Sequence, residues 1–113
     1  MKEADVVLTP ILQADGAIKN RPALILREMP RFRDFLVCGI STQLHQKVKN
    51  FDEIISRNDA DFSDSGLIAD SLIRLGFLAV LPSEKIAGTI GSVSEERHRR
   101  LLKNLSDYLI KNE

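Results

Sequence analysis

The sequence lacks several features that mark particular classes of protein. Of 113 residues, one is cysteine and none is tryptophan, and no apolar run is long enough to cross a bilayer. A single cysteine, Cys38, cannot form an internal disulfide and is typical of a reducing cytoplasm. The start of the chain has two acids and no apolar segment behind them, which argues against a secretory signal. We therefore expect one small domain, residues 1–113, in the cytoplasm and not in a membrane.

An excess of charge of one sign is also absent. The chain has 16 Lys and Arg against 16 Asp and Glu, which counts against a broad basic surface for nucleic acid. The few aromatic residues argue against a non-catalytic domain that recognises nucleic acid by base stacking. There is no glycine-rich phosphate loop and no Cys/His cluster, so we expect no cofactor and no metal. Asp59, Asp61 and Asp64 alternate as in a calcium loop, but the glycine and closing glutamate are missing, so we interpret them as solvated.

Short apolar runs separated by turn residues predict a mainly β protein. The expected strands are residues 6–8, closed by Thr9-Pro10, then 22–26, begun by Pro22, then 35–40, 53–55 and 76–82. The run 35–40 is continuous, which predicts burial on both faces of a sheet. Asp15-Gly16 predicts a turn over residues 13–17, and a loop with Pro30 follows the second strand. Residues 67–74 fit a strand or a helix equally well.

The C-terminal segment predicts one long helix. Ser94 is a good N-cap, and Glu95 and Glu96 lie in the first turn, where acids complement the helix dipole. An apolar or semi-apolar stripe at helical spacing consists of His98, Leu101, Leu102, Leu105, Tyr108 and Leu109. Strands first and a helix last indicate an α+β fold, in which a small curled sheet or barrel carries the helix.

Two segments contain candidate functional residues. In Lys19-Asn20-Arg21-Pro22-Ala23, Arg21 lies between a loop and a strand, where its guanidinium group is suited to bind two phosphate oxygens. In Ser41-Thr42-Gln43, hydroxyls follow a buried strand and are suited to donate to a phosphoryl oxygen. The alternatives are an ordinary surface arginine and an ordinary polar strand end.

Histidine is the usual proton carrier in RNA cleavage, and the chain has two. His98 lies on the apolar stripe of the predicted helix, which favours a half-buried packing role. His45 follows the Ser-Thr-Gln segment closely and is either a polar loop residue or a contact for substrate.

Three segments together resemble the PemK/MazF family of toxin–antitoxin toxins. They are Asp5-Val6-Val7-Leu8 through Asp15-Gly16 to Arg21-Pro22-Ala23-Leu24-Ile25-Leu26, then Val37 to Gln43, then Ile73-Arg74-Leu75 through Phe77–Leu81 and Ile90-Gly91-Ser92-Val93-Ser94 to the helix. The resemblance implies an SH3-like, partly open β-barrel of the CcdB/PemK/MazF kind with a C-terminal α-helix. It also implies a homodimer.

The resemblance further implies a sequence-selective, metal-independent endoribonuclease, the toxin of a type II toxin–antitoxin system. By position, its catalytic pair is Arg21 and Ser41, with Thr42 as the hydroxyl if the strand register differs by one residue. A serine keeps the hydroxyl of a threonine but has a freer rotamer. The 2′-OH of single-stranded RNA would attack the neighbouring phosphate and give a 2′,3′-cyclic phosphate, whereas DNA would bind without being cut.

The expected RNA contacts beyond this pair are Lys19, Asn20, Gln43, His45, Arg31 and Arg33. The implied partner is an antitoxin protein, with an acidic disordered segment lying across the groove near Arg21, Arg31 and Arg33.

Two other functions stay open. A CcdB-like toxin of the same fold would bind gyrase through its dimer face and terminal helix and cut no RNA. A non-catalytic domain would bind nucleic acid or a protein partner. The Arg-Pro-Ala and Ser-Thr-Gln segments favour the ribonuclease.

Overall fold

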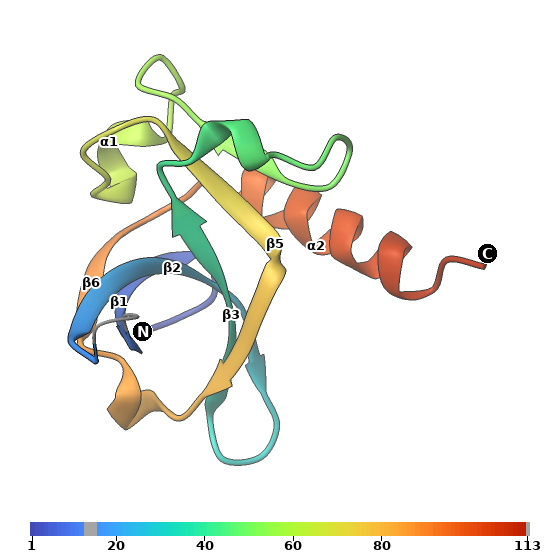
Figure 1. Cartoon of the computed structure of the whole chain (residues 1–113). Coiled ribbons are helices and arrows are strands. Elements are labelled where there is room, and N and C mark those ends of the chain that lie inside the picture. Colours follow the sequence, from blue (N-terminus) through green and yellow to red (C-terminus); the bar gives the residue numbers. More distant parts are fainter. Residues whose placement is uncertain (13–15, 113) are drawn as a thin grey trace.

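The computed structural model describes residues 1–12 and 16–112, within which six strands form one curled antiparallel sheet (Figure 1). The strands are β1 (Asp5–Leu12), β2 (Ile18–Met29), β3 (Asp34–Ser41), β4 (Glu53–Ile55), β5 (Ser71–Leu81) and β6 (Gly88–Ser92), in the sheet order β4-β5-β3-β2-β1-β6. The helices are α1 (Phe62–Ser65) and α2 (Glu95–Leu109), with short 3₁₀ turns η1 (Leu44–Gln46) and η2 (Ser83–Lys85). The curled sheet with a terminal helix confirms the predicted fold class. Most of the predicted turn around Asp15 lies outside the described residues.

The middle strands are buried on both faces of the sheet because alternate side chains enter two apolar clusters. Leu24 and Leu26 of β2 belong to the cluster under α2, together with Leu101 and Leu105 of the helix. Ala23 and Ile25 point to the other face and pack with Phe35 and Val37 of β3. This division confirms the burial predicted from the continuous apolar run of β3.

The first two strands are longer than predicted because both prolines lie inside them. Pro10 pairs with Asn20 and Pro22 pairs with Leu8 in the β1–β2 ladder. Pairing of β1 with β6 extends only to Leu8, and pairing of β2 with β3 begins at Ala23. Each proline therefore lies where its strand has a neighbour on one side, and a strand edge tolerates a missing N–H group.

Of the run at residues 67–74, for which strand and helix were both open, residues 71–74 form the start of β5 and residues 67–70 lie before it. Gly39 of β3 pairs with Arg74, whereas the preceding Cys38 pairs with Leu78, so residues 75–77 bulge out of the ladder. The bulge divides one strand into two apolar runs in the sequence. It also bends β5 next to the end of β3 (Figure 1).

Helix α2 begins as predicted, since the Ser94 hydroxyl accepts the Arg97 N–H at 3.1 Å. Of the predicted stripe, Leu101 and Leu105 are buried, but Tyr108 and Leu109 are 59% and 69% exposed. The prediction was wrong for these two because the end of α2 extends past the sheet (Figure 1). No helix in the described part of the chain is long and apolar enough to span a membrane.

A buried charge cluster, which we call the Arg97 cluster, joins the start of α2 to the segment before β5. The Arg97 guanidinium donates to Asp61, Glu53 and Asp59 at 2.9–3.2 Å. The same Asp61 carboxylate accepts the backbone N–H of Ser94 at 3.0 Å. Asp61 is buried, so the interpretation of that acid as a solvated loop residue was wrong.

Candidate active site

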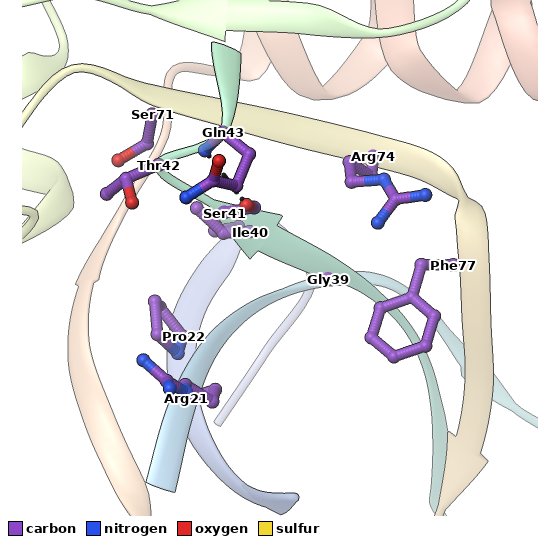
Figure 2. A pocket seen from close by; sticks show the side chains of 10 residues that line it. All are labelled: Arg21, Pro22, Gly39, Ile40, Ser41, Thr42, Gln43, Ser71, Arg74 and Phe77. Carbon is purple, nitrogen blue, oxygen red and sulfur yellow. Dashed lines mark hydrogen bonds between the residues drawn. The ribbon is translucent and has the colours of Figure 1, made fainter. Parts of the chain in front are cut away.

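A pocket of about 340 Å³ opens at the end of β3 (Figure 2). Its lining residues are Arg21, Pro22, Gly39, Ile40, Ser41, Thr42, Gln43, Ser71, Arg74 and Phe77. Because β3 lies between β2 and β5, the end of β3 forms the floor and the two neighbouring strands form the walls. The pocket thus brings together guanidinium and hydroxyl groups, which are the side chains best suited to bind a phosphate.

Arg21 lies on the β2 wall of this pocket. Its backbone pairs with Thr9 of β1, and the Thr9 hydroxyl donates to the Arg21 carbonyl oxygen at 3.3 Å. The residue itself is exposed. A fixed backbone below a solvent-accessible guanidinium group leaves the charge free to meet a ligand.

Ser41 ends β3 and is half-buried on the floor of the pocket. Its Oγ accepts the backbone N–H of Gln43 at 3.0 Å, so the side chain has a preferred rotamer although serine lacks a β-branch. With one lone pair occupied, the hydroxyl hydrogen remains available for donation. Thr42 and Gln43 also line the pocket but are exposed.

The β5 wall contains three residues that were not predicted from the sequence as site residues, namely Ser71, Arg74 and Phe77. Arg74 lies opposite Gly39, and its Cζ is 5.8 Å from the centroid of the Phe77 ring. Arg74 directly precedes the bulge at 75–77 and Phe77 is its last residue, and the sequence pattern did not reveal this bulge. The available sequence signal was a glycine, Gly76, that interrupts the apolar run between Arg74 and Phe77.

The other predicted contacts lie apart from this pocket. Lys19 and Asn20 are exposed on β2 before Arg21, and His45 is exposed in η1, so none of them lines it. Arg31 and Arg33 lie in the turn at residues 30–33, at the far end of the β2–β3 hairpin.

Since an antiparallel strand rises about 3.4 Å per residue, that turn is roughly 25 Å from Ser41 along β3. Within the turn region, Arg33 pairs with Glu28 at 3.5 Å. The structure therefore does not bring Arg31 and Arg33 together with Arg21.

Two further reactive side chains lie away from the pocket, Cys38 buried in the core and His98 half-buried on α2. Burial raises the pKa of the Cys38 thiol to about 12, with a smaller effect from Asp52, so the thiol stays protonated and is a poor nucleophile. His98 is half-buried as predicted, and its Nε2 donates to the Leu26 carbonyl oxygen at 2.7 Å. Among the described residues, no group of His, Cys, Asp and Glu side chains could hold a metal ion.

Comparisons with known proteins bear on the family and the fold of this chain. Residues 2–109 match the family described as PemK-like, MazF-like toxin of type II toxin–antitoxin system. Among solved structures, the Mycobacterium tuberculosis toxin MazF-mt6 is similar, with a TM-score of 0.67 and 17% identity over 96% of this chain and 99% of that one. At that identity the likeness shows the shared fold. No curated protein matched in sequence. Since the family match covers nearly the whole sequence, the chain belongs to the PemK/MazF family of type II toxins.

Proposed function

We propose that this chain is a sequence-selective endoribonuclease that cuts single-stranded RNA without a metal ion. The supporting observation is that Arg21 and Ser41, on different strands, line one pocket in a member of the PemK/MazF toxin family. Arg74 adds a second guanidinium group to the same pocket. Two positive charges and a positioned hydroxyl suit a phosphodiester that becomes dianionic during reaction.

In the proposed reaction the RNA supplies its own nucleophile. The 2′-oxygen forms a bond to the adjacent phosphorus, the bond from phosphorus to the 5′-oxygen breaks, and a 2′,3′-cyclic phosphate and a 5′-OH result. Arg21 and Arg74 bind the non-bridging oxygens, and Ser41 donates a hydrogen bond to one of them. One such donor is worth about 3–4 kcal/mol in comparable oxyanion sites.

Proton transfer completes the reaction. The 2′-OH loses a proton and the departing 5′-oxygen gains one. The described residues that line the pocket include neither a carboxylate nor an imidazole. We therefore assign charge stabilisation and positioning to the chain and proton exchange to solvent.

The substrate is single-stranded because attack needs the 2′-oxygen in line with the departing oxygen, and duplex RNA does not permit this. DNA has no 2′-OH, so it would bind the same cations and remain intact. Cleavage of RNA and survival of the matched DNA strand is therefore the expected pattern.

The direct test is cleavage of a mixed-sequence RNA in EDTA by the wild type and by Arg21→Ala. We expect cyclic-phosphate ends from the wild type and a rate at least about 100-fold lower from the variant, because a charge that stabilises the transition state is lost. Mapping the ends would give the recognition sequence.

Arg99→Ala is the matched control, since Arg99 is exposed on α2 and lies outside the pocket. It should cut at the wild-type rate. Equal activity of the Arg21 and Arg99 variants would remove Arg21 from the mechanism, and no RNA cleavage by the wild type would reject the nuclease.

The proposal includes an antitoxin, a homodimer and action in the cytoplasm. An acidic antitoxin segment that neutralises both Arg21 and the turn at 30–33 would have to run along the whole β2–β3 hairpin. Expression of the chain alone should arrest growth, and co-expression of the antitoxin should restore it. Sedimentation would test the dimer, for which the exposed Tyr108, Leu109 and Ile110 are available apolar surface.

A further inference from the structure

A half-exposed aromatic ring lies on the β5 side of the pocket. Phe77 is 52% exposed, and Figure 2 shows it beside Arg74. The Arg74 Cζ lies 5.8 Å from the ring centroid, which is within the range of a cation–π contact. The ring therefore has a cation at one side and open space in the pocket at the other.

Two features of the backbone keep the ring in this position. Phe77 belongs to the bulge at 75–77, so it has no place in the β3–β5 ladder. Gly39 lies beneath it, and a Cβ atom at that position would collide with Cδ2 of the Phe77 ring. The glycine thus lets the ring rest against the floor strand, two residues before Ser41.

We propose that Phe77 is a stacking platform for one RNA base, that of a nucleotide flanking the scissile phosphate. The proposal rests on the proposed ribonuclease function. A phosphate held between Arg21 and Ser41 places its neighbouring nucleotides within the same pocket, where Phe77 is the aromatic surface. Unpaired bases stack on such rings, and an adjacent arginine adds a planar cation for the base or its phosphate.

The polar surroundings favour RNA over a protein as the occupant. The pocket that Phe77 lines is also lined by Arg21, Arg74 and Gln43, which suit a polyanion better than an apolar partner. Leu78 and Val80 are also exposed further along β5, so a contact with a second copy or an antitoxin is the competing outcome. Phe77 would act in binding and in base preference, not in the chemical step.

The test measures binding of a 2′-O-methyl RNA strand, which lacks the attacking 2′-OH and cannot be cut. The variant is Phe77→Leu, which keeps an apolar side chain and removes the ring. We expect affinity to fall about 5- to 100-fold, the range for loss of one stacked base. An abasic nucleotide beside the scissile position should weaken wild-type binding similarly and abolish the difference between the two proteins.

Phe32→Leu is the matched control. Phe32 is 76% exposed and has Arg31 Cζ at the same 5.8 Å, but it lies in the turn at the far end of the hairpin. Its loss should leave affinity unchanged.

A second variant reads stacking directly. The chain contains no tryptophan, so Phe77→Trp introduces a single indole whose fluorescence a stacked base should quench. Phe32→Trp should not respond.

Unchanged affinity of Phe77→Leu, or an unquenched Phe77→Trp in bound RNA, would overturn the stacking role. If Phe77→Leu changed the oligomeric state and left RNA affinity unchanged, the stacking role would also be overturned, and Phe77 would be assigned to a protein contact. These failures differ from failure of the nuclease, in which the wild type binds RNA without cutting it. In that case a weaker Phe77→Leu complex would still support stacking.

Discussion

The Ser41 hydroxyl is the best-positioned candidate donor in the pocket, because the backbone of Gln43 fixes its rotamer. Ser41→Ala should lower the single-turnover cleavage rate about 100- to 1000-fold, as loss of one oxyanion donor does elsewhere. Thr42→Ala should change the rate far less, since Thr42 is exposed and follows the strand end. Rapid-quench cleavage of one defined RNA would measure both.

Ser41→Thr is the conservative control, which keeps a hydroxyl at the strand end. It should retain most of the wild-type rate. If Thr42→Ala were the inactive variant and Ser41→Ala active, the hydroxyl assignment would move by one residue.

Arg21 and Ser41 could be chosen from the sequence, whereas Arg74 and Phe77 could not. The first two lie beside recognisable segments, Arg-Pro-Ala and Ser-Thr-Gln, at ends of predicted strands. The other two depend on a bulge, and a break in a β ladder is a tertiary feature that periodicity does not record. Their role in the pocket therefore became visible only when β3 and β5 were paired.

Among the elements, α2 depends on one buried arginine at its start. The side chain of Arg97 is 7% exposed and donates to three acids, so Arg97→Leu would leave the buried Asp61 carboxylate without its cation. We expect a loss of about 3–5 kcal/mol in the free energy of unfolding. Urea denaturation followed by circular dichroism would measure it.

Arg100→Leu is the control on the same helix. Its side chain is 54% exposed and pairs with Glu53, so the expected loss is at most about 1 kcal/mol. Equal losses for the two variants would mean that the buried ion pairs of Arg97 stabilise the fold no more than the exposed pair of Arg100 does.

Five of the six strands and α2 were predicted in the right order, β4 with its observed limits and the other strands with shifted ones, whereas β6 and α1 were not predicted. Pro10 and Pro22 suggested strand ends, because a proline in a central strand loses a ladder hydrogen bond. Here both lie where only β1 and β2 pair, so the strands continue through them. Arg97 was overlooked although it lies one turn before Leu101, on the buried stripe of α2.

For the whole molecule, the fold is specified by a pattern that tolerates wide sequence change. MazF-mt6 shares 17% identity with this chain yet aligns over nearly its full length. The two apolar clusters need only alternating apolar residues in β2 and β3 and a stripe on α2, and many sequences satisfy that pattern. The pocket depends instead on a few individual side chains, so we expect substrate preference to vary more than fold among relatives.

Stability of the whole chain in acid should depend on Asp61. Burial by itself would raise the pKa of Asp61, but hydrogen bonds from Arg97 and the Ser94 backbone outweigh it, and the folded-state pKa lies below its ordinary value. The stabilisation is then fully present above the unfolded pKa of about 3.9 and is lost as pH falls through the lower folded-state value. Asp61→Asn should cost about 1.5–3 kcal/mol near pH 7, because a charged hydrogen-bond acceptor is lost.

The difference in urea midpoint between wild type and Asp61→Asn should therefore shrink below about pH 4, where the Asp61 carboxylate begins to protonate in the unfolded chain. Asp107→Asn serves as the control, since Asp107 is 58% exposed in its pair with Lys103 and should shift the midpoint little at any pH. A gap for Asp61→Asn that stayed constant from pH 7 to pH 2.5 would show that the carboxylate charge is not what stabilises the Arg97 cluster. If the difference in urea midpoint disappears at low pH, the loss of stability in acid comes from the Arg97–Asp61 contact, which joins α2 to the segment preceding β5.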